Sequence, residues 1–163
     1  MVKSVKSIFV VLAFSSFISL SFNEESVVNE KLSLGDQIPE LVLQNEKQVL
    51  NLQSSNGKYT LLSFWAAYDA NSRQLNAELS HKLQSSPNVK MISVSFDTYR
   101  SIYDAAMLQD GIGSAENHLE TDGENSKAFK SFGLENGFKN YLLDSKGVII
   151  ATNVTANELS AYI

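Results

Sequence analysis

Two strongly apolar segments, separated by an amphipathic one, constrain the fold of this 163-residue chain more than any other feature. Tyr59–Trp65 is nearly continuous in apolar character and rich in β-formers, as is typical of a strand buried on both faces, and Val89–Phe96 is predicted to be the next strand. Between them, apolar residues recur at helical spacing over about residues 70–85, which predicts a helix that packs on a sheet. The residues on that helix face are Leu75, Ala77, Leu79 and Leu83. A strand, a helix and a strand in this order predict two parallel strands joined by a right-handed crossover.

Shorter patterns on either side of this unit complete an α/β architecture. Apolar residues over Leu41–Leu52 predict an N-terminal β-hairpin that turns at Asn45–Lys47. A second helix is predicted to begin near Thr98 or Ser101 and to end at about Gln109. Its inward residues are expected to be Ile102, Ala105, Ala106 and Leu108. The other expected elements are a short strand and turn over Asn117–Gly123, a helix over Asn125–Phe132, a hairpin over Tyr141–Ala151 and a last helix over Asn157–Ile163.

The segment that joins the first buried strand to the amphipathic helix carries a family motif. Phe64–Arg73 reads F-W-A-A-Y-D-A-N-S-R and resembles the F-W-A-x-W-C-x-x-C-R segment of thioredoxin-fold proteins, particularly the TlpA-like and AhpC/TSA (redoxin) group. Leu34–Leu43 resembles the G-D-x-A-P-x-F-x-L opening of the redoxin group. The resemblance covers about Leu34 to Ile163. It implies a three-layer thioredoxin-like fold, a central mixed sheet flanked by helices, with the N-terminal β-hairpin as an extension.

The same resemblance implies that the residues of thiol chemistry have been replaced. Asp69 stands at the position of the nucleophilic cysteine, Ser72 at that of the resolving cysteine, and Ser63 where many thioredoxins have a buried acid. The chain contains no cysteine, so it cannot form the thiolate that disulfide exchange and thiol peroxidase chemistry require. Asp69 is expected to act mainly as a helix cap, because a carboxylate is among the best N-cap residues and suits the positive end of the helix dipole. An anion-mimicking or catalytic role for Asp69 is the alternative.

A second family feature is also altered. The resemblance places Phe138 at the position of the cis-proline that faces the active site and presents backbone groups to an extended peptide. A cis bond before a residue other than proline costs about 3 kcal/mol, so we expect a trans bond before Phe138. Peptide docking of the usual family kind is therefore not expected here.

Aromatic and charged residues around the altered motif are the candidates for binding: Trp65, Tyr68, Asp69, Arg73 and Phe138. Tyr68 stands where the family usually has tryptophan, and Phe138 is expected to face it across the site. With Trp65 they would form an apolar patch fitted to a partner, which is expected to be a protein or peptide. The alternative is that Trp65 and Phe138 fill core space left by the lost catalytic geometry.

The N-terminal segment has the features of a secretory signal. Lys3 and Lys6 precede an apolar run over Ile8–Phe17, and Ser19–Ser21 supplies small residues for cleavage. An uncleaved anchoring segment is the alternative, although the run is shorter than the roughly 20 residues of a spanning helix. We therefore expect export to the periplasm or cell envelope, with the membrane as a partner only if this segment is retained. The expected division is a signal peptide over residues 1–21, a linker over 22–33 and a thioredoxin-like domain over 34–163.

Charge and motif content exclude several other classes of function. The formal net charge of −5 argues against nucleic acid as a partner. His81 and His118 are isolated and lack the spacing of metal ligands, so neither a metal nor another cofactor is predicted. Asp97, Asp104 and Asp110 are interpreted as a solvated face.

The sequence thus predicts an exported thioredoxin-like domain that serves as a non-catalytic binding or accessory module. A rival hypothesis is an enzyme with non-thiol chemistry at the helix N-terminus, built on Asp69, Ser72 and Arg73, although no general base or metal motif accompanies them. A third hypothesis is a structural subunit of an envelope assembly.

Overall fold

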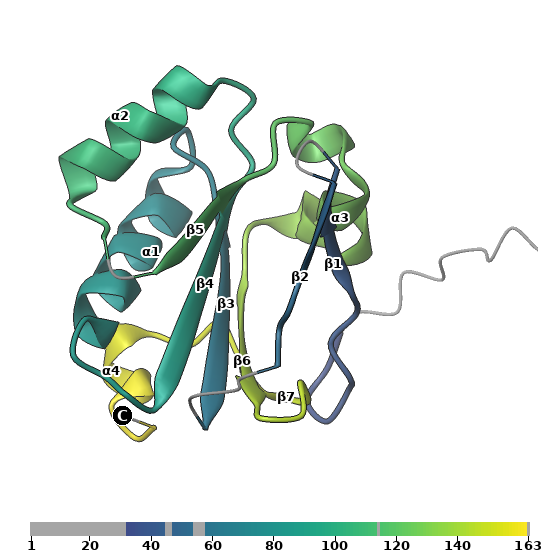
Figure 1. The fold of residues 1–163 in the computed structure, drawn as a ribbon, viewed down its shortest axis with the longest axis vertical. Helices are drawn as coiled ribbons and strands as arrows, with labels where there is room; N and C mark the ends of the chain where they lie inside the picture. Colours follow the sequence, from purple (N-terminus) through teal and green to yellow (C-terminus); the bar gives the residue numbers. More distant parts are fainter. Residues whose placement is uncertain (1–31, 45–46, 54–57, 114, 163) are drawn as a thin grey trace, which may run out of the picture.

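A computed structural model describes residues 32–44, 47–53, 58–113 and 115–162 (Figure 1). The predicted signal peptide and the greater part of the predicted linker lie outside the described residues. Within those ranges, the helices are all too short or too polar to cross a membrane.

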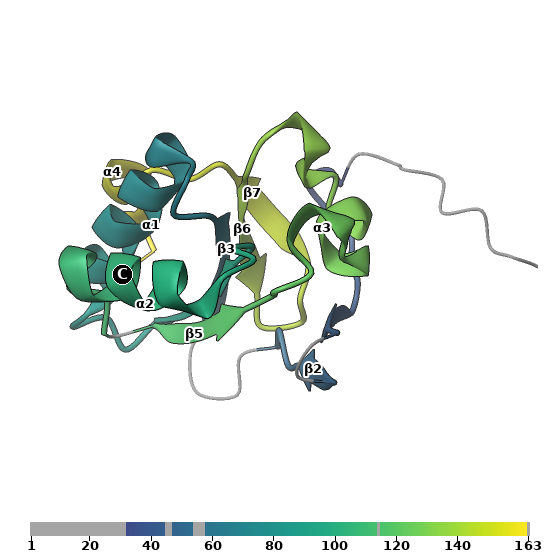
Figure 2. The same cartoon turned by 90° about the horizontal axis from the view of Figure 1, so that it is seen from above.

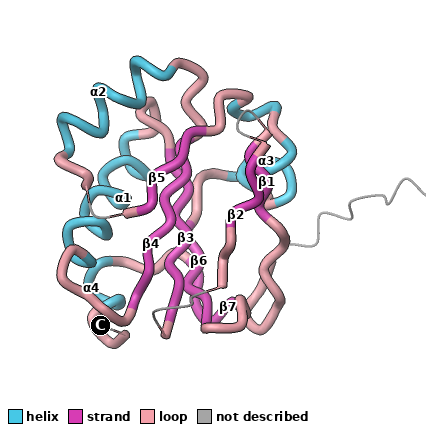
Figure 3. The backbone as a smooth tube through the Cα atoms, in the orientation of Figure 1, coloured by secondary structure: helices cyan, strands magenta, loops and turns pink. Residues whose placement is uncertain are grey.

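The central sheet has five strands in the order β5-β4-β3-β6-β7 (Figures 1 and 3). Strands β3, β4 and β5 run parallel, whereas β6 is antiparallel to β3 and β7 is antiparallel to β6. The strands are β3 (Tyr59–Trp65), β4 (Val89–Ser95), β5 (Glu116–Leu119), β6 (Asn140–Asp144) and β7 (Ile149–Thr152). This mixed sheet, with β3 at its centre, confirms the predicted α/β fold.

Helices and a small hairpin cover the two faces of the sheet (Figure 2). One face carries α1 (Ala70–Leu83), α2 (Arg100–Asp110) and α4 (Ala156–Leu159). The other carries α3 (Lys127–Ser131), the 3₁₀ turns η1 (Gly123–Asn125) and η2 (Leu134–Asn136), and the predicted hairpin of β1 (Leu41–Leu43) and β2 (Gln48–Leu50). The last helix is shorter than expected, because α4 ends at Leu159 after a single capped turn.

Alternation along the two long parallel strands divides the core between the faces. Leu62 and Phe64 of β3 belong to a cluster with α3 and the β1–β2 hairpin. Leu61, the neighbour of Leu62, packs with Leu79 and Leu83 of α1 on the opposite face. Leu75, Leu79 and Leu83 of the predicted face therefore meet the sheet, whereas Ala77 lines a surface groove instead.

Helix α2 is packed differently from the prediction. Tyr103 and Ala106 are its buried residues, whereas Ile102 is 47% exposed and Leu108 is 84% exposed. Ala105 is also exposed, so the expectation that these three residues face inward is wrong. The reason is the Tyr103 ring, which lies against the buried Trp65 at 6.1 Å between centroids and sets which side of the helix faces the sheet.

The family-like opening segment docks on the β6–β7 hairpin. The Gly35 amide donates to the Ile149 carbonyl at 2.8 Å, and the Ile149 amide donates to the Asp36 carbonyl at 2.9 Å. The turn requires glycine at Gly147, where φ is 83° and an added Cβ would lie 2.8 Å from the Gln37 side-chain nitrogen. These contacts join the start of the domain to its far sheet edge.

The larger core cluster can be tested by substituting Phe64. Its ring is 2% exposed and lies 4.8 Å from the Phe132 ring and 5.7 Å from the Phe96 ring, centroid to centroid. Phe64→Ala should lower the free energy of unfolding by about 3–5 kcal/mol in chemical denaturation, because it leaves a cavity at the centre of the cluster. The control Val49→Ala, at a residue 54% exposed on β2, should cost less than about 0.5 kcal/mol. Equal losses for the two variants would contradict this description of the core.

Candidate functional site

The altered motif forms the loop between β3 and α1 and the first turn of that helix. Asp69 is the N-cap, with extended backbone (φ −97°, ψ 99°), and its carboxylate accepts the Ser72 amide hydrogen at 2.7 Å. The Ser72 hydroxyl donates to the Asp69 carbonyl at 3.2 Å and accepts from the Ala66 amide at 3.4 Å. Both side chains at the former cysteine positions therefore satisfy backbone groups at the helix start.

A buried carboxylate holds this loop from below. Asp97 is 3% exposed, and each of its carboxylate oxygens lies 3.0 Å from the Ala67 amide nitrogen, which donates to it. The Ser95 hydroxyl donates to the same carboxylate at 2.7 Å. The interpretation of Asp97 as part of a solvated face is wrong, because the end of β4 brings it under the neighbouring loop rather than into solvent.

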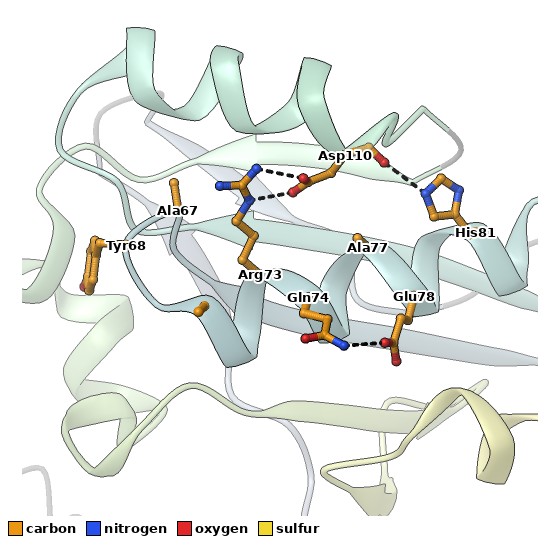
Figure 4. Close-up of a pocket in the computed structure, with 9 residues that line it drawn as sticks. Ala67, Tyr68, Arg73, Gln74, Ala77, Glu78, His81 and Asp110 are labelled. Atoms are coloured by element: carbon orange, nitrogen blue, oxygen red, sulfur yellow. Dashed lines mark hydrogen bonds and ion pairs between the residues drawn. The ribbon is translucent and has the colours of Figure 1, made fainter.

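Arg73 is held by the end of α2 (Figure 4). Its Nε and one Nη donate to the two carboxylate oxygens of Asp110, each at 2.7 Å, and the same Nη donates to Gln109 Oε1 at 2.9 Å. The hydrogen bond and charge of Asp110 raise the pKa of the Arg73 guanidinium. Asp110 is thus an ion-pair partner rather than a solvated carboxylate, whereas Asp104 is exposed and pairs with Arg100 at 3.1 Å. The guanidinium therefore links α1 to α2, and its Nε and one Nη are already bonded to residues of α2.

Trp65 is fully buried. Its indole nitrogen donates to the Ser93 hydroxyl at 2.9 Å, and that hydroxyl donates to the Asn76 side-chain oxygen at 3.0 Å. The expectation that Trp65 contributes to an exposed binding patch is therefore wrong. Strand alternation directs this side chain under α2, so it belongs to the core, as the alternative interpretation held.

Tyr68 and Phe138 do face one another. Their ring centroids lie 6.2 Å apart, and Tyr68 is 62% exposed. Phe138 is half-buried, stacked on Phe96 at 6.1 Å and edge-on to Phe129 at 6.0 Å. The described chain has no cis peptide bond, so the bond before Phe138 is trans, as expected. The exposed aromatic surface is thus chiefly Tyr68, backed by the edge of Phe138.

The sequence reasoning missed Glu124, which is the hydrogen-bond partner of Tyr68. The Tyr68 hydroxyl donates to Glu124 Oε1 at 3.2 Å. Partial burial of the phenol, this hydrogen bond and the negative charges of Glu124, Asp97 and Asp69 raise the pKa of Tyr68 to about 12. Glu124 lies in a turn without periodic pattern, 56 residues from Tyr68, so no local signal could have paired them.

The arrangement offers little to catalysis. His81 meets the Asp110 carbonyl at 2.9 Å, outside the loop, and His118 lies beside Glu116 at 3.2 Å on β5. Over the described ranges, no three histidine or acidic residues come together in a way that could hold a metal ion. The Asp69 and Ser72 side chains are bonded to backbone groups at the start of α1.

Comparison with known proteins places this architecture in a family. No protein-family model and no curated protein matches the sequence. A thioredoxin-like protein from Parabacteroides distasonis is 34% identical, with a TM-score of 0.72 over 80% of this chain and 94% of that one. A thiol-disulfide oxidoreductase from Bacteroides fragilis is 23% identical, with a TM-score of 0.62 over 77% of this chain and 96% of that one. The thioredoxin domain of a thiol-disulfide oxidoreductase from Bacteroides vulgatus is 20% identical, with a TM-score of 0.65 over 80% and 95%.

These proteins share the thioredoxin-like fold with the present chain. At the identity and coverage of the Parabacteroides structure, the chain belongs to the thioredoxin-like family, as a member without cysteine.

The cap at Asp69 can be tested by substitution. Asp69→Ala should lower the free energy of unfolding by about 1 kcal/mol, because the Ser72 amide loses its acceptor and the helix dipole loses a favourable charge. Asp69→Asn should cost less, since asparagine caps nearly as well. Chemical denaturation at neutral pH measures both. An alanine variant as stable as the parent would remove the structural role of Asp69 and favour a chemical one.

The environment of Tyr68 can be tested by its titration. In a spectrophotometric titration of tyrosinate, Tyr68→Phe should remove a component with a pKa near 12, and Glu124→Gln should lower that pKa. Because the folded pKa is raised, the contribution of Tyr68 to stability is complete below the ordinary tyrosine pKa of about 10 and is lost as the pH rises toward 12. A titration unchanged by Glu124→Gln would contradict the pairing.

Proposed function

We propose that this protein is an exported, non-catalytic binding module that recognises a protein or peptide through the surface around Tyr68. One observation carries the proposal. The positions where the family motif has its two cysteines are occupied by Asp69 and Ser72, which cap α1, while the adjacent Tyr68 remains 62% exposed. The site has kept its architecture and its exposed aromatic residue, and it lacks the thiols that family chemistry needs.

The geometry of Tyr68 supports binding. A large aromatic group that combines apolar area with a polar end is the kind of residue in which interface energy concentrates. The hydrogen bond to Glu124 and the contact with Phe138 hold the ring in one orientation. Less side-chain freedom is then lost on binding, which favours affinity.

The enzyme hypothesis has weaker support. The three residues on which it depends are already engaged: Asp69 and Ser72 with backbone groups, and Arg73 with Asp110. A structural subunit would not require an exposed Tyr68 held by Glu124 and Phe138, and this hypothesis offers no explanation for that arrangement. Export is proposed from the basic residues Lys3 and Lys6 and the apolar run that follows them.

Partner capture tests the proposal. The full chain, immobilised, should capture a defined set of proteins or peptides from an envelope extract of its host, and Tyr68→Ala should abolish that capture while leaving the thermal unfolding midpoint nearly unchanged. Val49→Ala, a similarly exposed residue on the β1–β2 hairpin, is the matched control and should capture as the parent does. Capture that is indifferent to Tyr68→Ala would contradict the proposal and place binding elsewhere.

The same preparation should neither reduce insulin nor consume peroxide above the buffer rate, because it has no thiol. Activity that persists through repeated purification would instead support the enzyme hypothesis.

A further inference from the structure

A groove of about 440 Å³ begins at Tyr68 and follows α1 toward the C-terminal end of α2 (Figure 4). Ala67, Ala70 and Ala77 are among its lining residues, and their small side chains leave the floor low and apolar. In Figure 4, Tyr68 stands at one end of this groove and His81 at the other. The groove is lined by the β3–α1 loop, α1 and the end of α2, and Tyr68 is the lining residue that also contacts Phe138.

The charge of the groove is negative. Arg73 is the cation of its lining, and both oxygens of the Asp110 carboxylate bind that guanidinium, so the pair is close to neutral. Glu78 is exposed on the rim and accepts a hydrogen bond from the neutral Gln74 amide at 2.9 Å, so the lining has two carboxylates against one guanidinium. Beyond the Tyr68 end, and outside the lining itself, the Glu124 carboxylate of η1 accepts a hydrogen bond from the phenol.

Negative charges also surround the Tyr68 hydroxyl at the end of the groove. Partial burial of its phenol, the hydrogen bond to Glu124 and the negative charges of Glu124, Asp97 and Asp69 all raise the pKa of its hydroxyl. Lys139, which follows Phe138, donates its ammonium to the Gly133 carbonyl at 3.0 Å and is directed to that turn. A cation arriving from a partner would therefore meet carboxylates and an aromatic face.

We propose that this groove binds an extended basic peptide segment, with aliphatic stems of lysine or arginine on the alanine floor and their charged ends at Glu78 and Glu124. Long cationic side chains bury their stems on apolar surface while the charged end stays hydrated, which suits a shallow groove with acidic rims. A cationic end over the exposed Tyr68 ring gains a cation–π contact. The inference rests on the proposed function and names the class of partner, which charge complementarity selects.

Fluorescence anisotropy with the full chain tests the preference. The probes are three labelled decapeptides of alternating lysine and alanine, serine and alanine, and glutamate and alanine. At low ionic strength the lysine peptide should bind about tenfold or more tightly than the serine peptide, and the glutamate peptide should not bind measurably. Affinity for the lysine peptide should fall as salt rises, since rim charges are screened.

Substitutions inside and outside the groove show where the lysine peptide binds. Tyr68→Ala and Glu78→Gln should each weaken the lysine peptide about fivefold, and Ala77→Leu should weaken it by filling the floor. Glu40→Gln removes the same charge beside a different pocket, which Gly147 also lines, and should leave the affinity unchanged. Since Tyr68, Glu78 and Glu40 are exposed, these substitutions should leave thermal unfolding nearly unaltered.

The outcomes separate this inference from the proposed function. Equal weakening by Glu78→Gln and Glu40→Gln would overturn the inference, because binding would then follow net charge alone. Equal affinity for the lysine and serine peptides, or no peptide binding at all, would also overturn it. In those cases the envelope capture with Tyr68→Ala still decides the proposed function independently.

Discussion

Strand β3 pairs with β4 along its whole length and with β6 from Tyr59 to Ser63, and both of its faces are covered. A strand enclosed in this way exposes no polar group to a ligand, and its side chains are committed to the two cores. A side chain that contacts a ligand must therefore lie beyond the end of β3, in the loop that leads to α1. The position of Tyr68 and of the groove beside it follows from the burial of β3.

Hydrogen-bond acceptors, and not apolar packing alone, hold the loop between β3 and α1 in place. The buried Asp97 accepts the Ala67 amide, Asp69 accepts the Ser72 amide, and the Ser72 hydroxyl accepts the Ala66 amide. Leaving a fully buried donor unpaired costs about 1–3 kcal/mol, and these three donors are part-buried, so each bond favours the loop geometry by a smaller amount. Asp69 and Ser72 thus hold the loop in the geometry that displays Tyr68.

Sequence patterns predicted the features that depend on neighbours in the chain. The parallel pair of β3 and β4, the helix between them and the cap at Asp69 all follow from local periodicity and capping preference. The features that could not be predicted depend on contacts between distant segments. The exposure of Ile102 follows from the fit of Tyr103 against Trp65, and the burial of Asp97 follows from the adjacent loop. The pairing of Tyr68 with Glu124 joins segments with no shared pattern.

The packing of Phe138 bears on the side from which the proposed partner would approach. The family resemblance implies a cis-proline at this position, with backbone groups presented to an extended peptide, whereas the bond before Phe138 is trans. The phenylalanine ring stacks on Phe96 and lies edge-on to Phe129, which fills that flank with apolar packing. On the opposite flank, α1 carries Ala70 and Ala77 beside α2, and small side chains leave space there. Tyr68 lies between the flank that Phe138 fills and the open flank beside α2. A ligand that contacts Tyr68 can therefore extend along α1 without displacing core side chains.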